Sequence, residues 1–505
     1  MSLLPKILRT ALAPRLRQIE RFRRHPAEVQ AEQLRYLLGK AAETEFGKAH
    51  GFAGIRSIEQ FAAAVPVQDY DAAFGCIDRA RFGEQDVIWP GEVRWFAKSS
   101  GTTGGRSKYI PVTKNGLKQS HIQGPADCIA FNIDRFPSTG VYGGKTLTLG
   151  GSHRIEREGE HALTGDLSAI LIENAPFIAN LRRVPKTSTA LIADFEEKIE
   201  RICEECVGED VRSLAGVPSW NLVMLRRVLE YTGKANLLEV WPRLELFIHG
   251  GVNFSPYREI YERLIPTGGM HYMETYNASE GFFAISDDFS DDMLLMLDYG
   301  IFYEFLPLGE LADPSRAIPL EGVRTGVNYA MIISSSNGLW RYLIGDTVEF
   351  TSLSPYRLRI SGRTKHYINA FGEEIIVDNA ERAIRAASDA TGATVTEYTA
   401  APIYMDIDKK GAHQWVVEFA TPPADIEAFR GALDRGLQEL NSDYEAKRYK
   451  NTTLYAPTVT PVPEGTFLRW MQSRGKTGGQ NKVPRLSNDR TYIDQILTMV
   501  NENNS

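Results

Sequence analysis

The sequence predicts an α/β protein with a large amino-terminal mixed α/β domain and a smaller carboxyl-terminal α+β domain. Its 505 residues exceed what a single hydrophobic core usually holds. Short strand-like apolar runs alternate with helical stretches over most of the chain, as in mixed α/β domains. Beyond Val377 the pattern shortens to helix, strand, strand, helix and strand, which suits a small unit with its own core.

The amino-terminal part begins with a predicted helical segment over residues 15–50, where apolar residues recur three and four positions apart. Helical stretches follow at 189–207 and 219–231. Strand-like runs stand at residues 145–150, 244–249, 269–274 and 328–333. Because the two helical stretches lie between the first two of these runs, the pattern predicts a mixed α/β domain.

The carboxyl-terminal part has predicted helices at 378–391 and 423–440. Strands are predicted near residues 395–405, 414–420 and 453–461. The turn Ser361–Lys365 precedes this change of pattern. We therefore expect an amino-terminal domain over residues 1–365 and a carboxyl-terminal domain over residues 366–505.

Composition argues against several classes of protein. With 43% apolar and 24% charged residues the chain resembles an ordinary globular protein. A formal net charge of -7 argues against a dedicated nucleic-acid binder. Because no run of about 18 apolar residues occurs, we expect no membrane partner.

The first residues are rich in Arg and Leu as far as Arg24, which suits either a transit or membrane-surface helix or a helix docked on the first domain. Acidic residues such as Glu20 and Glu28 favour the docked helix. We expect a cytoplasmic protein, either a monomer or a weak homo-oligomer. Cys203 and Cys206 lie in a helical pattern without a second pair, so they are interpreted as buried helix cysteines rather than zinc ligands.

The segment Phe96–Lys108 is the most informative part of the chain. It combines hydroxyl side chains, glycines and cations, a composition that suits a phosphate-binding loop. It is not a Walker loop, because a strand-like run follows it instead of a helix. A flexible linker of the same composition is the alternative.

Two more segments place polar residues after a predicted strand, where open α/β sheets bind ligands. His249–Gly251 has glycines that allow close approach of a flat base or a backbone, although a plain strand-to-helix turn has the same composition. Tyr276–Gly281 offers a ring for stacking, small polar groups and Glu280. A carboxylate beside bound phosphates suits Mg²⁺, and a helix cap is the alternative for Glu280.

Asp346 interrupts an apolar strand pattern beside a glycine. One carboxylate can accept hydrogen bonds from both hydroxyls of a ribose, so Asp346 is a candidate for sugar recognition, unless Gly345 and Asp346 merely form a bulge or turn. The loop Gly475–Arg485 is glycine-rich and basic, and by itself it resembles a flexible tail.

Taken in order, these segments resemble the Gretchen Hagen family of acyl acid amido synthetases, which belongs to the adenylate-forming, firefly-luciferase-like superfamily. Ser99–Gly104 resembles the phosphate loop of that family. Tyr276–Glu280 resembles its Tyr-x-x-Ser-Glu motif for adenine and metal, and Tyr342–Asp346 resembles its Tyr-x-x-Gly-Asp ribose motif. The resemblance implies a luciferase-like amino-terminal domain and a mobile carboxyl-terminal domain.

The resemblance also implies a reaction in two steps. ATP and a carboxylic acid form an acyl-adenylate and pyrophosphate, and the amine of an amino acid then displaces AMP. ATP and Mg²⁺ would be the cofactors, and a small-molecule carboxylic acid and an amino acid or another amine the substrates. Two alternatives remain, namely an acyl-CoA ligase with the same first step and a non-catalytic scaffold that binds nucleotide.

Roles for individual residues follow from the resemblance. Lys482 would be the mobile catalytic lysine, and Glu280 would hold the metal and take part in catalysis. Thr148 and His153 are candidates for the acyl pocket, where the glycine-rich loop 145–154 differs from the plant members. The predicted ATP-binding residues are Ser99, Ser100, Gly101, Thr102, Thr103, Gly104, His249, Gly250, Gly251, Thr275, Tyr276, Asn277, Ala278, Ser279, Asp346 and Arg363.

Overall fold

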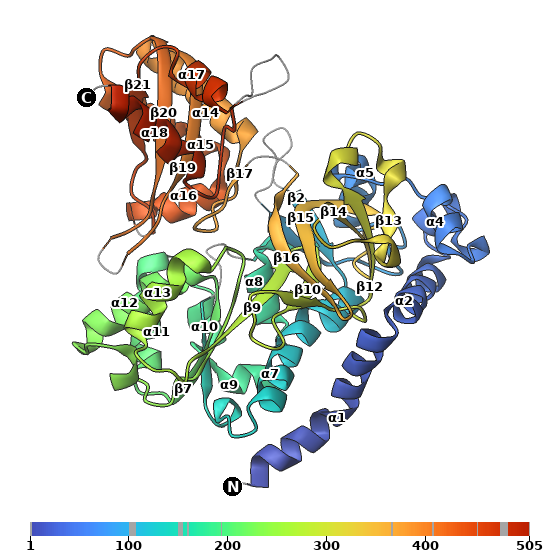
Figure 1. Cartoon of the computed structure of the whole chain (residues 1–505). Coiled ribbons are helices and arrows are strands. Elements are labelled where there is room, and N and C mark those ends of the chain that lie inside the picture. Colours follow the sequence, from blue (N-terminus) through green and yellow to red (C-terminus); the bar gives the residue numbers. More distant parts are fainter. Residues whose placement is uncertain are drawn as a thin grey trace.

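The computed structural model describes residues 3–99, 108–149, 155–158, 161–192, 194–364, 367–406, 409–451, 453–474 and 483–503. Within these ranges the predicted α/β class is confirmed. A large amino-terminal body carries a smaller carboxyl-terminal unit that has a sheet of its own (Figure 1).

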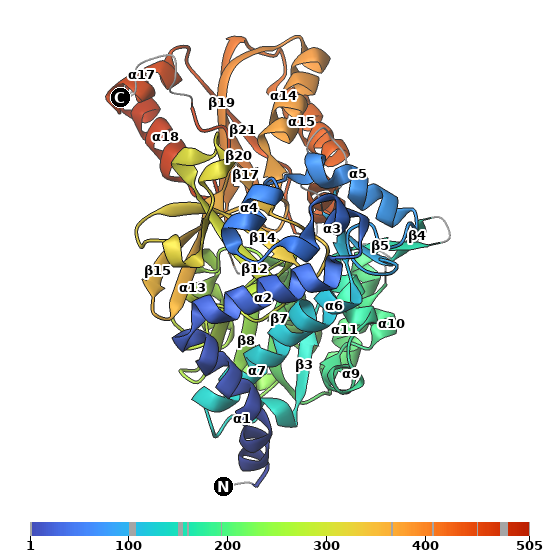
Figure 2. The ribbon, with the colours of Figure 1, turned by 90° about the vertical axis from the view of Figure 1, so that its right-hand side faces the viewer.

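Helices open the chain and cover one side of the amino-terminal body (Figure 2). They are α1 (Leu3–Arg24), α2 (Pro26–Ala41), α3 (Glu45–Ala49), α4 (Ile58–Ala64) and α5 (Tyr70–Arg81). The single helical segment predicted over residues 15–50 is therefore three helices. Pro26 starts α2, and the Thr44 side chain caps α3 by accepting from the Gly47 N–H.

The prediction that the Arg- and Leu-rich start docks on the first domain is confirmed. Arg15 on α1 donates to Asp127 on α7 (Gln123–Arg135) over 2.7 Å. The Tyr299 hydroxyl donates to the same carboxylate over 2.7 Å. Asp127 is 1% exposed, so its charge is buried beside the buried Tyr299 and the partly buried Arg15.

The main sheet of the described chain has twelve strands in the order β13-β12-β14-β15-β16-β11-β10-β9-β8-β7-β3-β6. The strands from β6 to β9 are parallel, and the rest pair antiparallel. Their bounds are β3 (Lys145–Thr148), β6 (Arg183–Val184), β7 (Val211–Gly216), β8 (Leu246–Gly250), β9 (His271–Ala278), β10 (Gly281–Ile285), β11 (Met293–Leu295), β12 (Ile301–Pro307), β13 (Ile318–Pro319), β14 (Asn328–Ser335), β15 (Tyr342–Leu353) and β16 (Tyr356–Arg363).

Helices connect the parallel strands, as parallel pairing requires. The chain passes through α10 (Thr187–Ala190) and α11 (Phe195–Cys206) before β7, through α12 (Pro218–Thr232) before β8, and through α13 (Ser255–Leu264) before β9. Cys203 and Cys206 are buried free thiols in α11, as predicted. Among the described residues no cluster of three or more His, Cys, Asp and Glu side chains could hold a metal ion.

A second, four-stranded sheet has the order β2-β1-β5-β4. Its strands are β1 (Trp95–Ser99), β2 (Lys108–Val112), β4 (Glu156–Glu158) and β5 (Ala162–Gly165). Three helices belong to the same region, namely α6 (Lys114–Gly116), α8 (Leu167–Glu173) and α9 (Phe177–Arg182), and a π-helical turn over Leu117–Ile122 leads into α7. None of the helices in the described ranges is long and apolar enough to cross a membrane.

The carboxyl-terminal unit contains the predicted order of helices and strands. Its sheet pairs β19 antiparallel with β20, and β20 parallel with β21. The last predicted strand starts five residues later than expected, because the N–H groups of Thr453 and Leu454 bind the Lys447 carbonyl instead of a strand. The elements are β17 (Tyr367–Ile368), β18 (Ile375–Ile376), α14 (Val377–Thr391), β19 (Thr394–Ile403), β20 (Ala412–Thr421), α15 (Ile426–Leu440), α16 (Ser442–Arg448), β21 (Thr458–Val462), α17 (Thr466–Ser473) and α18 (Thr491–Asn503).

The carboxyl-terminal unit packs against α12 and α13 (Figure 1). Two buried hydrogen bonds join these helices to the first turn of the carboxyl-terminal unit. The Tyr257 hydroxyl donates to the Ala370 carbonyl over 2.6 Å, and the Ser219 hydroxyl donates to the Phe371 carbonyl over 3.1 Å. The unit is therefore docked next to the carboxyl ends of β7 and β8.

Candidate active site

The carboxyl ends of the parallel strands β3, β7, β8 and β9 meet at one edge of the main sheet. This edge is where open α/β sheets bind ligands. Gly250 at the end of β8 pairs with Thr275 on β9, and a Cβ atom on Gly250 would lie only 2.5 Å from the Thr275 carbonyl oxygen. Glycine is therefore required here for the two strands to pair closely.

Asp346 on β15 is held from two sides. Arg363, its partner across β15 and β16, donates to one carboxylate oxygen over 2.9 Å. The Tyr276 hydroxyl on β9 donates to the other over 2.8 Å. The structure thus joins two predicted motifs, and it gives Asp346 a fixed orientation with 9% of the residue exposed.

Glu280 occupies a two-residue turn between β9 and β10, where Gly281 pairs with Ala278. The residue is 8% exposed. Burial raises the pKa of Glu280 to about 7, the positive charge of Lys108 opposes the shift, and the Asp346 carboxylate adds to it. A cation at this turn would therefore stabilise the charged carboxylate.

Lys108 connects Glu280 to the predicted phosphate loop. It is the first residue of β2 and pairs with Ser99, the last residue of β1. The end of β1 and the start of β2 are therefore neighbours. Lys108 lies close enough to the Glu280 carboxylate for its charge to lower the pKa of that group. Ser100, Gly101, Thr102, Thr103 and Gly104 lie outside the described residues, as do His153 and Lys482.

Asn337 fixes the Glu280 turn, a role that the sequence did not suggest. Its side chain donates to the Glu280 carbonyl over 3.2 Å and accepts from the Thr113 N–H over 3.0 Å. Gly116 leaves room for it, since a Cβ atom there would lie 1.8 Å from the Asn337 oxygen. The buried polar run Ser334–Asn337 between two apolar strands was the available signal.

Two predicted nucleotide contacts are placed differently from what the sequence suggested. The His249 ring is 2% exposed and stacks on Phe254 at 4.0 Å, and burial lowers its pKa to about 3. The Tyr276 ring is 3% exposed and packs against Phe283, so it presents no open stacking face in this structure. Strand alternation explains both, because these side chains point into packed layers of the sheet.

The remaining predicted residues lie around the same edge. The Thr275 hydroxyl donates to the His249 carbonyl over 3.0 Å, Asn277 is exposed, and Ala278 and Ser279 lead into the Glu280 turn. Thr148 ends β3, and its buried hydroxyl has no hydrogen-bond partner among the described residues. That free hydroxyl is consistent with a ligand near β3.

The carboxyl-terminal unit also reaches this edge. The Asn369 side chain donates to the Gly251 carbonyl over 3.1 Å. Glu374 accepts from Arg363 over 3.3 Å and has a positive φ of 42°, a strained conformation for a residue with a side chain. Arg363 therefore links Asp346 to the first turn of the carboxyl-terminal unit.

Family models match this chain in three blocks. The GH3 family N-terminal domain matches residues 15–270, the central domain 294–363 and the C-terminal domain 378–491. The chain belongs to the GH3 family. The GH3 blocks contain Gly250, Asp346 and Arg363, and the Gretchen Hagen resemblance is confirmed.

Known relatives match the sequence of this GH3-family chain over nearly its whole length. It is 24% identical to indole-3-acetic acid-amido synthetase GH3.8 of Oryza sativa subsp. indica, over 93% of this chain and 90% of that protein. It is also 24% identical to indole-3-acetic acid-amido synthetase GH3.3 of Arabidopsis thaliana, over 93% and 91%.

Two solved structures have the same fold. The AtGH3.15 acyl acid amido synthetase in complex with 2,4-DB superposes with a TM-score of 0.58 at 19% identity, covering 94% of this chain and 93% of that one. A 2-hydroxyisobutyryl-CoA ligase in complex with 2-HIB-AMP and CoA gives 0.54 at 16% identity, covering 95% and 92%.

Proposed function

We propose that this GH3-family chain is an ATP-dependent acyl acid amido synthetase. It would adenylate a carboxylic acid and transfer the acyl group to the amine of an amino acid. The observation that carries the proposal is the convergence of Tyr276, Asp346 and Arg363 beside the buried Glu280 at the carboxyl edge of the sheet. Relatives named amido synthetases that match over nine-tenths of the chain support it.

In the first half-reaction the chain must hold ATP and orient its α-phosphate toward a carboxylate. Asp346 would accept hydrogen bonds from the ribose hydroxyls, with Tyr276 and Arg363 keeping it in place. The segment from Ser99 to Lys108 would hold the phosphates, and its glycine N–H groups and hydroxyls would stabilise the departing pyrophosphate.

Mg²⁺ fits the donors present at this site. It is usually held by one or two carboxylates together with substrate phosphates, and Glu280 supplies one buried carboxylate beside the predicted phosphate segment. When bound, the ion would offset the negative charge that develops on pyrophosphate. The turn that Asn337 holds would keep the Glu280 carboxylate directed at it.

In the second half-reaction a neutral amine attacks the acyl-adenylate and releases AMP. The proposed division is an amino-terminal domain over residues 1–365 and a mobile domain over residues 366–505. Lys482 of the mobile domain would act during adenylation, since a flexible lysine can arrive and leave with its domain. Thr148 and His153 are the proposed acyl-pocket residues.

The test is a matrix of carboxylic acids against amino acids and CoA. Acid-dependent exchange between ATP and pyrophosphate reports the first step, and AMP release on addition of an acceptor reports the second. We expect exchange with at least one acid and AMP release with an amino acid. AMP release with CoA alone would replace the proposal by an acyl-CoA ligase, and no exchange with any acid would leave a nucleotide-binding scaffold.

A further inference from the structure

A turn at the start of the carboxyl-terminal unit contacts the amino-terminal body. The turn covers Asn369–Gly372, directly after β17. Its two central carbonyls accept hydrogen bonds from Tyr257 and Ser219 of the amino-terminal body. Gly372 has a positive φ of 86°, which glycine adopts without strain. The conformation of this turn therefore determines whether the two carbonyls reach their donors.

One buried carboxylate holds the other side of the same turn. Glu373 is 0% exposed, and it accepts from the N–H of Ala370 over 3.3 Å and from the N–H of Phe371 over 2.7 Å. The peptide group between Ala370 and Phe371 is thus held at both ends. Its carbonyl accepts from Tyr257, and its N–H donates to Glu373.

His413 on β20 connects Glu373 to the sheet of the carboxyl-terminal unit. The His413 Nε2 atom lies 2.8 Å from Glu373 Oε1, and both side chains are 0% exposed. An ionised carboxylate can only accept, so Nε2 is the donor. The imidazole also stacks with the rings of Phe371 and Tyr444, whose centres lie 6.1 and 5.5 Å from its own. The turn is thereby joined to the core of its own unit.

The Glu373 and His413 pair does more than fill this core. A buried charge is costly unless it is fully hydrogen-bonded, and apolar side chains of similar size often stabilise a core as well. Of the three hydrogen bonds that Glu373 accepts from described residues, two come from the docked turn. The bonds of Glu373 are therefore directed mainly at the surface that meets the amino-terminal body.

Glu418 of the same unit provides a contrast. It is 4% exposed and likewise accepts from two backbone N–H groups, those of Gly465 over 3.0 Å and Phe467 over 3.1 Å. These groups lie at the start of α17, on the side of the unit away from α12 and α13 (Figures 1 and 2). Glu418 thus has the same kind of bonds as Glu373 but no part in docking.

We propose that Glu373 and His413 are positioning residues that keep the carboxyl-terminal unit docked. They act through the peptide group between Ala370 and Phe371, and so they stabilise the contact with α12 and α13. In one respect this role rests on the proposed function, because the half-reaction that uses the docked arrangement should depend on the pair more than the other does. A pair that only stabilised the core would affect both half-reactions equally.

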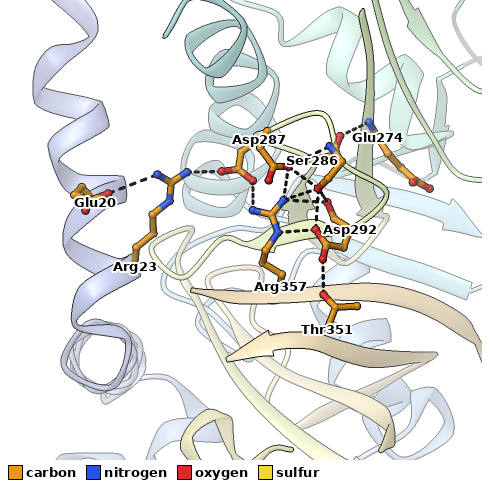
Figure 3. A network of polar contacts seen from close by, with 10 residues as sticks. Glu20, Arg23, Glu274, Ser286, Asp287, Asp292, Thr351 and Arg357 are labelled. Carbon is orange, nitrogen blue, oxygen red and sulfur yellow. Dashed lines mark hydrogen bonds and ion pairs between the residues drawn. The ribbon is translucent and has the colours of Figure 1, made fainter. Parts of the chain in front are cut away.

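The test compares matched variants of the full chain. Glu373→Gln replaces one acceptor oxygen by an N–H donor beside the turn, and Glu418→Gln makes the same change away from the interface. His413→Gln keeps an N–H donor, whereas His413→Phe removes it. Asp287→Asn disturbs the buried ion-pair network between α1 and the main sheet and controls for general loss of stability (Figure 3). Thermal melts show which variants remain folded.

Limited proteolysis between residues 364 and 367 measures docking without any substrate. We expect cleavage to be about fivefold faster or more in Glu373→Gln and His413→Phe, less affected in His413→Gln, and unchanged in both controls. Tyr257→Phe should add little to Glu373→Gln, because both act on one peptide group, and should add in full to Glu418→Gln. Full additivity with Glu373→Gln, or equal cleavage in the two His413 variants, would overturn the proposal.

The two half-reactions provide a second measurement. Pyrophosphate exchange and amine-dependent AMP release are measured for each variant with the acid and amino acid of fastest turnover. We expect their ratio to change by about fivefold or more in Glu373→Gln and to stay the same in Glu418→Gln. An unchanged ratio in Glu373→Gln, or an equal change in Glu418→Gln, would overturn the proposal. Absence of exchange with every acid would instead refute the proposed function, and proteolysis would still decide whether the pair controls docking.

Discussion

Asp346 depends on a tyrosine that the sequence suggested for another task. Tyr276 and Arg363 each donate one hydrogen bond to it, so the carboxylate keeps one orientation before any nucleotide arrives. Preorganisation of this kind lowers the cost of binding. Tyr276 is therefore expected to contribute to nucleotide affinity through Asp346.

Replacement of either residue should be visible in ATP affinity. Asp346→Ala removes the proposed ribose acceptor and should raise the KM for ATP by about tenfold or more. Tyr276→Phe removes only the hydroxyl and should raise it by roughly threefold to tenfold. Steady-state kinetics at saturating acid measure both, with the exposed Asp389→Ala as the control. An unchanged KM in Asp346→Ala would remove this residue from the ribose site.

Glu274 lies on β9 next to Thr275 and gives a prediction about pH and stability. Burial raises the pKa of Glu274 to about 7, the Asp291 charge adds to the shift, and Arg258 opposes it. A carboxyl whose pKa is raised by folding destabilises the folded state when it is charged. The cost is absent below the unfolded pKa and is complete above the folded pKa.

Glu274→Gln should therefore have little effect near pH 4 and should stabilise the chain by up to about 3 kcal/mol above pH 7. The midpoint of urea unfolding measured at several pH values tests this. Glu259→Gln, on the surface of α13, serves as the control. A stabilisation that does not grow between pH 4.5 and pH 7 would contradict the shifted pKa.

Residue types that carry chemistry were visible in the sequence, but their surroundings were not. Asp346 stood out as a lone carboxylate in an apolar strand pattern, and Glu280 as a carboxylate in a polar run after a strand. The structure brings both to one edge. His249 looked equally accessible, yet its ring is buried against Phe254. Which face of a strand is buried depends on α13, which covers it, and the strand pattern alone does not contain that information.

The β8 and β9 strands illustrate how one glycine sets the spacing of two elements. A Cβ atom on Gly250 would lie 2.5 Å from a backbone oxygen that cannot move independently of β9. Gly250→Ala should therefore destabilise the chain by about 1–3 kcal/mol and raise the KM for ATP, since β9 carries Tyr276.

Gly39→Ala is the matched control, because nothing lies within 4 Å of a Cβ atom there and the residue is in the exposed part of α2. That substitution should stabilise the chain by about 0.5–1 kcal/mol. The midpoints of urea unfolding of both variants, compared with that of the unsubstituted chain, measure these changes in stability. Equal effects of the two substitutions would mean that the β8–β9 spacing tolerates a methyl group.

The order of helices and strands was predictable where it follows from local sequence patterns. The pairing of strands that are distant in the sequence was not. The helices and strands from α14 to α15 agree with their pattern to within a few residues, because helix and strand periods alternate there. The pairing of β11 with β16 joins Met293 to Leu358, more than sixty positions apart. The pairing of such distant strands depends on the packing of the whole sheet, and the periodicity of the sequence gives no information about it.

At the scale of the whole molecule, the carboxyl-terminal unit is docked beside the carboxyl edge of the main sheet. It contacts the amino-terminal body through Tyr257 and Ser219, and Lys447 lies over the Trp220 ring at 5.0 Å. If residues 366–505 change position between the half-reactions, as proposed, the docked arrangement is suited to only one of the two half-reactions.

Weakening the docked arrangement should therefore affect the two half-reactions unequally. Trp220→Ala combined with Tyr257→Phe removes a ring contact and a hydrogen bond from the interface while leaving Asp346, Glu280 and Arg363 in place. We expect the ratio of pyrophosphate exchange to amine-dependent AMP release to change by about fivefold or more, because about 1–2 kcal/mol of docking energy is lost. Phe177→Ala, an exposed residue on α9, controls for loss of an aromatic side chain. Limited proteolysis between residues 364 and 367 reports whether the unit has loosened. Equal losses in both half-reactions of a loosened variant would contradict a domain that alternates between two positions.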